Sequence, residues 1–227
     1  MLVRQPWQRH HAAMITTHDQ PLANVAEHLR DDEIHVWWLD YHPVLGRAPL
    51  HRVLAGYLDI PVAEVSLVDG EHGRPALAAS HGSGLGFNWS HSGDHAVIAV
   101  GRHITAGIDL ERQQRRPRAL DIANRYFSRE EAETLAGLPE NQRDAAFLRL
   151  WTAKEAVLKA LGRGLAFGLD RLNISFADDR LTLQRLEGEL ASAWQLQALP
   201  VGHAHVAALA WRGHARRIRF GTLASED

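Results

Sequence analysis

The sequence predicts an α+β fold built from two halves of similar design. Two segments carry apolar residues at helical spacing, a shorter one over 50–58 and a longer one over 147–165. Each is followed by short runs rich in β-branched and aromatic residues, which are typical of strands. Because this coarse order occurs twice, we expect a seam near 101–106, with an N-terminal half over 1–103 and a C-terminal half over 104–227. A cleft at such a seam is a common place for a ligand.

Composition narrows the functional classes. The chain has 227 residues, of which 45% are hydrophobic, so it can bury a sizeable core. The net charge of -2 argues against a general nucleic-acid binder. There is no cysteine, which excludes disulfides and thiol catalysis and fits a cytoplasmic protein. No signal-peptide pattern and no apolar run long enough for a membrane span is present, so we expect no membrane partner.

The first half predicts a few regular elements after an irregular lead-in over 1–19. A short helix is expected over 21–29, and Pro61 closes the helix over 50–58. Turn-rich sequence predicts loops over 69–75 and 90–94. The expected strands are 34–39, 65–68 and 95–100.

The second half begins with a strand over 104–111 and then becomes helical. A helix is expected over 119–126, and Ser128 with Glu131 forms the pattern of a capping box that starts another helix. A long helix runs from about 141 to 161, where Gly162 ends it. Alternating patterns predict strands over 172–176, 181–186, 194–199, 205–211 and 218–223.

Three charged residues of the long helix need an explanation. Lys154 lies within the apolar stripe, where a charge is costly unless it has a partner or reaches water. Glu155 and Lys159 lie four residues apart at the border of that stripe. They form either a surface ion pair of about 0.2–0.5 kcal/mol or a carboxylate ligand and a proton donor that face a cleft.

Asp109 and Glu111 alternate on one strand, so both carboxylates point to the same face. They are either solvated at a sheet edge or share a cation. Together with Glu155 they would form an oxygen-only ligand set, which suits Mg²⁺ bound through carboxylates, water and substrate phosphate. Arg74, in a stiff turn, could bind phosphate through its planar guanidinium, and His91 could assist. Taken singly, Arg74 is as well explained as an exposed turn residue and His91 as a structural histidine.

Five segments follow one another in a distinctive order: GRP at 73–75, FNWSHS at 87–92, GIDLE at 107–111, FSREE at 127–131 and WTAKEAVLK at 151–159. This order resembles the 4′-phosphopantetheinyl transferases, of the long monomeric type represented by the surfactin-synthesis enzyme. The pairing of G-[IV]-D-x-E with W-x-x-K-E-[AS]-x-x-K is highly specific for that family. The likeness extends from about residue 73 to 165.

The resemblance implies two α+β halves related by a pseudo-twofold axis, with the active site at their interface. It implies transfer of phosphopantetheine from coenzyme A to a serine of an apo acyl or peptidyl carrier protein, with release of 3′,5′-ADP. Asp109, Glu111 and Glu155 would hold Mg²⁺ against the coenzyme A diphosphate. Lys159 would approach the same diphosphate and could protonate the leaving phosphate, and Glu131 would help deprotonate the carrier serine.

The resemblance also implies a nucleotide site. Arg74 and His91 would contact the 3′-phosphate, and Gly73, Pro75 and Ser90 would line the pocket. Relatives usually carry lysine in place of Arg74, which preserves the charge. The basic residues that relatives carry before the first long helix have no secure equivalent here, although Arg47 and Arg52 are candidates; residues 1–30 match nothing.

Carrier docking is expected after the long helix, where Arg163, Leu165 and Phe167 could contact an acidic carrier. Leu169 is equally well explained by packing. Among the arginines over 112–118 we expect Arg115 and Arg116 to be solvated. Fatty-acid, polyketide and nonribosomal-peptide carriers all remain open, and we expect a monomer because one chain supplies both halves.

Two alternative functions compete with the transferase. A magnesium-dependent phosphohydrolase could use the same three carboxylates on a nucleotide or coenzyme A diphosphate. A non-enzymatic carrier-binding protein would require loss of Asp109, Glu155 or Lys159, and all three are present.

Overall fold

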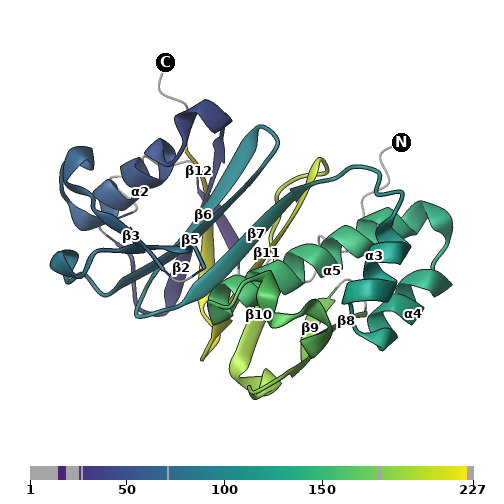
Figure 1. The fold of residues 1–227 in the computed structure, drawn as a ribbon. Coiled ribbons are helices and arrows are strands. Elements are labelled where there is room, and N and C mark those ends of the chain that lie inside the picture. The colour runs from purple at the N-terminus through teal and green to yellow at the C-terminus, as the bar shows by residue number, and fades with distance from the viewer. Residues whose placement is uncertain (1–14, 19–25, 27, 71, 178–179, 224–227) are drawn as a thin grey trace.

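The computed structural model confirms an α+β fold. It describes the chain except for residues 1–14, 19–25, 27, 71, 178–179 and 224–227. A mixed five-stranded sheet and an antiparallel three-stranded sheet lie next to each other in the middle of the molecule, with α2 on one outer side and α5, α3 and α4 on the other (Figure 1). The helix expected over 21–29 lies largely outside the described residues.

The first half contains one long helix and a small hairpin beside its sheet. Its elements are β2 (Glu33–Asp40), α2 (Ala48–Leu58), β3 (Leu67–Asp69), β4 (Pro75–Leu77), β5 (Leu85–Ser92) and β6 (His95–Arg102). The second half adds two short helices. Its elements are β7 (Ala106–Arg112), α3 (Ala119–Tyr126), α4 (Arg129–Gly137), α5 (Glu140–Leu161), β8 (Leu172–Ala177), β9 (Arg180–Leu186), β10 (Trp194–Ala198) and β11 (His205–Arg212).

The two halves repeat one topology. Each runs strand, long helix, two-stranded hairpin and two further strands, with α3 and α4 inserted before the long helix of the second half. In the first half the strands are ordered β2-β6-β5, and in the second β7-β11-β10, so the last strand lies between the other two in both. The expected pair of similar halves is therefore visible in the strand order.

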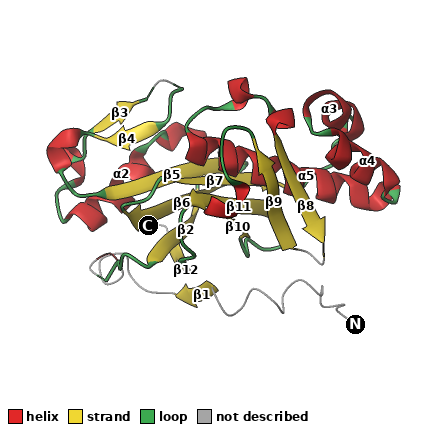
Figure 2. Cartoon of the chain, turned by 90° about the horizontal axis from the view of Figure 1, so that it is seen from below, coloured by secondary structure: helices red, strands yellow, loops and turns green. Residues whose placement is uncertain are grey.

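A strand from the end of the chain completes the first sheet. β12 (Arg217–Leu223) pairs in parallel with β2 on one side and with β1 (Ile15–His18) on the other. Figure 2 shows β12 and β1 beyond β2, at the margin of the sheet. The boundary expected after residue 103 falls in the turn between β6 and β7. As a division into domains it stays a prediction.

Strand alternation creates three apolar cores. In β6, Ile98 packs toward α2, while Val97 and Ala99 pack toward the second sheet. In β7, Ile108 and Leu110 join that same core between the sheets. The third core lies around α5 and the β8–β9 hairpin. The face of β7 opposite the central core therefore carries Gly107, Asp109 and Glu111 toward α5, as the two-residue spacing predicts.

Most of the expected elements are present, and three expectations were wrong. Residues 15–18, expected to be irregular, form β1, because β12 offers them a parallel edge. The loop expected over 69–75 ends at Pro75, which opens the short strand β4. The loop expected over 90–94 is strand up to Ser92, because the full length of β5 pairs with β6 and leaves only a tight turn at Gly93.

Candidate active site

The candidate site lies where β7 meets α5 and the edge strand β5. A close contact brings the two elements together. A Cβ atom at Gly107 would overlap the Ala156 carbonyl oxygen and the Ala160 amide of α5, so only glycine permits this approach. Asp109 follows two residues after Gly107 on the same face, and Glu155 and Lys159 flank the contact on the helix. The glycine thereby places carboxylates from distant parts of the sequence near one another.

Asp109, Ser90 and Lys159 form the centre of the site. Asp109 is 6% exposed. Its Oδ1 accepts hydrogen bonds from Lys159 Nζ at 2.8 Å and from Ser90 Oγ at 2.9 Å. Lys159 Nζ also donates to Ser90 Oγ at 3.0 Å and to the Ile108 carbonyl at 3.1 Å. Lys159 therefore does not form the surface ion pair with Glu155 that was one of the two expectations. Its ammonium instead binds residues of β5 and β7.

Glu111 lies at the outer side of this centre. Its Oε2 accepts from Arg116 Nη2 at 2.9 Å and from Ser92 Oγ at 3.4 Å. Burial raises the pKa of Glu111, the charge of Asp109 raises it further, and Arg116 lowers it. Arg116, expected to be solvated, instead pairs with a carboxylate of the site.

Glu155 faces the site without a compensating partner at one oxygen. Its buried Oε1 has no hydrogen-bond partner. Burial raises the pKa of Glu155 to about 7, and the nearby charge of Asp109 adds to this while Lys159 opposes it. Shifts of this kind are typical of groups that act on a ligand.

The donor set fits a hard divalent cation. Asp109 Oδ2 and Glu155 Oε1 are both buried oxygens that lack a hydrogen-bond partner. Both are therefore available to coordinate a cation. The ligand atoms of Asp109, Glu111 and Glu155 do not all lie within 4.8 Å of one another. A shared ion would therefore have to draw the carboxylates closer together than they are here.

Among the residues predicted to bind the nucleotide, Arg74, Pro75 and Gly73 lie in and before β4. Arg74 uses its guanidinium on main-chain carbonyls: it donates to Lys159, to Ala106 at 2.7 Å and to Phe87 at 3.3 Å. It thus caps the C-terminal end of α5, where a cation is favourable. Pro75 is buried at the start of β4, and Gly73 occupies the preceding turn with a positive φ of 72°.

His91 remains accessible beside the site. Its ring stacks on Tyr41 with 4.6 Å between the ring centroids. Burial lowers the pKa of His91, and the positive charge of Lys159 lowers it further. His91 is therefore close enough to Lys159 for the two charges to interact.

Glu131 belongs to a different network. Its Oε2 accepts from the Ser128 amide at 2.9 Å, completing the capping box that the sequence predicts, and lies 2.6 Å from Lys154 Nζ. Its Oε1 accepts from the Ile174 amide at 2.8 Å. Lys154 thus finds the buried partner that its place in the apolar stripe requires. Glu131 forms neither a hydrogen bond nor an ion pair with Asp109, and its role as a base stays a prediction.

Two polar residues of β5 join the halves and were not singled out from the sequence. Asn88 Oδ1 accepts from the Ile108 amide at 2.8 Å, and Ser92 Oγ accepts from the Arg112 amide at 3.0 Å. Their side chains take the place of a partner strand along this edge of β7. The sequence contains a signal for this role, because Asn88, Ser90 and Ser92 alternate and so share one face of a strand. That face was not recognised because residues 90–94 were expected to form a loop.

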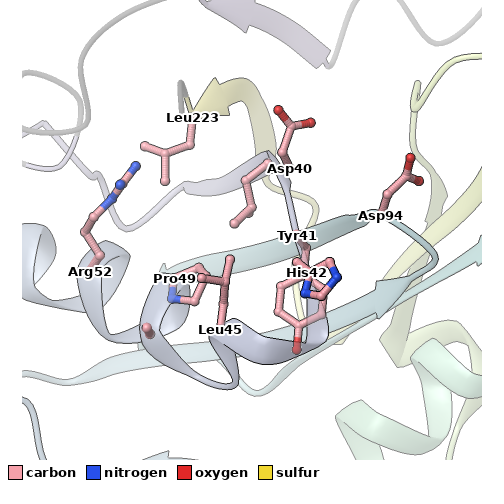
Figure 3. Close-up of a pocket in the computed structure, with 10 residues that line it drawn as sticks. Asp40, Tyr41, His42, Leu45, Pro49, Arg52, Asp94 and Leu223 are labelled. Atoms are coloured by element: carbon pink, nitrogen blue, oxygen red, sulfur yellow. The ribbon is translucent and has the colours of Figure 1, made fainter. Parts of the chain in front are cut away.

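A separate pocket lies beside α2. Figure 3 shows this pocket, of about 540 Å³, lined by the end of β2, the start of α2, Asp94 and Leu223. It includes Arg52, one of the two candidate phosphate-binding arginines. The other, Arg47, is paired with Asp69 at 2.7 Å. None of the residues predicted from the family motifs lines this pocket.

Among the helices that the structure describes, none is long and apolar enough to span a membrane.

The segment that follows α5 contains one exposed and one buried leucine. Leu165 is 54% exposed, whereas Leu169 is buried in the core around α5. The packing explanation therefore holds for Leu169.

Known proteins resemble the chain across most of its length. Residues 105–210 match the model of the 4′-phosphopantetheinyl transferase superfamily. The chain is 34% identical over 212 residues to the 4′-phosphopantetheinyl transferase HetI of Nostoc, covering 89% of this chain and 87% of that protein. It is 30% identical over 185 residues to the human L-aminoadipate-semialdehyde dehydrogenase-phosphopantetheinyl transferase, covering 74% of this chain and 60% of that one.

Solved structures give a weaker likeness. A holo-(acyl-carrier-protein) synthase from Bacillus anthracis, in complex with CoA (3′,5′-ADP), is 21% identical with a TM-score of 0.40. The match covers 49% of this chain and 98% of that one.

Proposed function

This chain belongs to the 4′-phosphopantetheinyl transferase family, and on that premise we propose that it loads apo carrier proteins from coenzyme A. The hydroxyl oxygen of a carrier serine attacks the phosphorus next to the pantetheine arm. A new serine O–P bond forms, the bridging P–O bond of the diphosphate breaks, and 3′,5′-ADP leaves. The serine proton is lost in this step, and the leaving phosphate gains charge.

The observation that carries this proposal is the meeting of acids and a cation at Asp109. A diphosphate needs charge neutralisation and positioning more than covalent assistance. Asp109, Glu111 and Glu155 are the residues that would hold Mg²⁺, and two of them present buried unpartnered oxygens. When bound, the metal would neutralise charge on the diphosphate as a Lewis acid.

Lys159 is suited to the leaving group. Its ammonium is positioned by Asp109, Ser90 and the Ile108 carbonyl, so it points at the face of β7 where the acids lie. A diphosphate drawn to that face would exchange some of these hydrogen bonds for phosphate oxygens. Lys159 would then offset the charge that builds on the leaving phosphate, or give up a proton to it.

The nucleotide end is proposed to lie over β5. His91 is exposed and would contact the 3′-phosphate, while Arg74 would first have to release at least one main-chain carbonyl. Gly73, Pro75 and Ser90 would line this end of the site. Glu131 has weaker support as the base, because both of its oxygens are already engaged.

The acceptor is proposed to be an apo acyl or peptidyl carrier protein. The exposed Leu165, with Arg163 close by in sequence, offers an apolar contact beside a positive charge, which suits an acidic carrier helix. One chain supplies both halves of the site, so we expect a monomer, which a solution mass would test. The cytoplasmic location expected from the sequence stays a prediction.

Mass spectrometry of an apo carrier incubated with coenzyme A and Mg²⁺ tests the proposal. The expected result is a gain of one phosphopantetheine mass on a single serine, with 3′,5′-ADP released. Asp109→Ala should abolish the gain while its circular dichroism stays that of the wild type. Hydrolysis of coenzyme A with no change in carrier mass would instead support the phosphohydrolase alternative, which no feature of the site favours.

A further inference from the structure

A second polar cluster lies outside the proposed active site, where the two halves meet. Asp94 lies in the turn of the β5–β6 hairpin, His95 begins β6, and His205 begins β11 in the other half. One ligand atom from each of the three lies within 4.8 Å of the others. Among the described residues this is the one group of histidine and carboxylate side chains that meets this spacing.

The buried histidine of this cluster has an unused nitrogen. His205 is 6% exposed, and its Nε2 has no hydrogen-bond partner. This nitrogen is therefore available to a ligand that enters the cluster. In metal sites a histidine binds the ion through one neutral ring nitrogen.

The ring planes are held in place by packing. Trp38 of β2 stacks on His95 with 4.5 Å between centroids and meets the edge of His205 at 5.2 Å. The two imidazoles are themselves 4.9 Å apart. Because two of the three donors are rings fixed against a tryptophan, little side-chain freedom has to be lost on binding an ion.

Ion pairing accounts for only part of the cluster. His95 Nδ1 lies 2.9 Å from Asp94 Oδ1, and its Nε2 lies 3.5 Å from Asp40 Oδ1. These pairs explain why carboxylates surround His95. They leave the buried Nε2 of His205 unexplained, because it takes part in neither pair.

We propose that Asp94, His95 and His205 form a binding site for a divalent transition-metal ion of the Zn²⁺ type. Two imidazole nitrogens with one carboxylate oxygen are a ligand set suited to zinc and its neighbours, and unsuited to the all-oxygen preference of Mg²⁺. Asp40 also pairs with His95 and lines the α2 pocket together with Asp94 (Figure 3), so it could provide a further oxygen.

The site would clamp the two halves together. The ion would tie the hairpin turn of the first sheet to β11 of the second, close to Ser92, whose side chain contacts Glu111. The proposal is independent of the transferase function, because it concerns another ligand set and needs neither coenzyme A nor a carrier.

Calorimetric titration of the full, chelator-treated protein with ZnCl₂ tests the site. The variants Asp94→Asn and His95→Gln suit the test because both residues are partly exposed, with side chains 74% and 24% exposed. The control is His214→Gln, the same substitution at an exposed histidine in the turn before β12. A control is needed because the chain has fifteen histidines.

The wild type and His214→Gln should each bind one equivalent of Zn²⁺ that the two site variants bind more than about 10-fold more weakly. Co²⁺ should give a visible absorption band that His95→Gln removes. Equal Zn²⁺ stoichiometry and affinity in the wild type and His95→Gln would overturn the proposal, as would no Zn²⁺ uptake by the wild type. Carrier loading by the Zn²⁺-free protein is unaffected by either outcome, so the two proposals can fail separately.

Discussion

Replacing Lys154 by methionine should destabilise the protein strongly, because Lys154 is a buried cation with three oxygen partners. Its Nζ lies 2.6 Å from Glu131 Oε2 and donates to the carbonyls of Leu169 and Leu172, both at 2.8 Å. Lys154 is 0% exposed and Glu131 is 3% exposed. Burial lowers the pKa of Lys154, and the charge of Glu131 opposes that effect.

The size of the effect follows from what the substitution leaves behind. Methionine fills similar space but leaves the Glu131 carboxylate buried without its cation, which typically costs about 3–5 kcal/mol. The Ser128 and Ile174 amides still donate to Glu131, which places the loss near the lower end of that range. The two carbonyls that lose a donor add about 1 kcal/mol. We expect the free energy of unfolding to fall by about 4 kcal/mol in total.

Urea unfolding followed by circular dichroism measures this loss. Glu131→Gln keeps the capping-box bonds, since glutamine also serves at that position, but leaves Lys154 buried without a counterion. The double variant Glu131→Gln/Lys154→Met removes both charges, so it should lose clearly less stability than the two single losses added together. A loss below about 1 kcal/mol in Lys154→Met, or simple additivity in the double variant, would refute the reasoning.

The same variants separate the two interpretations of Glu131. If its role is structural, Glu131→Gln lowers stability while the folded enzyme keeps its kcat at low temperature. If Glu131 deprotonates the carrier serine, kcat falls sharply while the urea midpoint changes little.

Three further predictions concern the site itself. Asp109→Asn should lower kcat for carrier loading by more than about 100-fold with little change in fold, because it removes a proposed metal ligand and the partner of Lys159; EDTA should have a similar effect on the wild type, and full activity in EDTA would count against metal dependence. In metal-free protein, Glu155 holds its proton up to about pH 7, well above its ordinary pKa of 4.5. The folded state therefore binds more protons than the unfolded state between these values, and the free energy of unfolding should fall as pH rises through that window; Glu155→Gln should remove this fall, on the order of 1–3 kcal/mol, in urea titrations at several pH values. Arg74→Met should lower the free energy of unfolding by about 1–3 kcal/mol because three carbonyls lose their donor, and Arg74→Lys should recover part of this; equal stability of all three proteins would show that the cap is unimportant.

Local patterns were enough to predict the helices α2, α3, α4 and α5 and most of the strands. Ala119–Tyr126 and the capping box at Ser128 depend on neighbouring residues alone, so sequence rules capture them. The two-residue spacing of Asp109 and Glu111 likewise gave their common face. The α+β class and the repeated halves followed from the same patterns.

Local sequence patterns did not predict features that depend on contacts between residues far apart in the sequence. β1 forms because β12 offers it a parallel edge. Ser90 and Ser92 looked like part of a loop, although they pair with β6 and their side chains contact residues of β7. The sequence indicated that Lys154 needs a buried partner, but it did not indicate that this partner is Glu131. The phosphate contact predicted for Arg74 comes from the resemblance, and no local pattern reveals that its guanidinium also lies beside the end of α5.

The position of β12 has a consequence for how the protein is made. β2 lies beside β12, whose Ile218 and Phe220 contribute to the apolar layer between the sheets. During synthesis β2 emerges well before β12, so until β12 follows, β2 keeps an open hydrogen-bonding edge and an uncovered apolar flank. The first sheet can reach its final form only after β12 has been synthesised. Nascent chains stalled before Arg217 should therefore be aggregation-prone, and loading of carriers should require synthesis through β12.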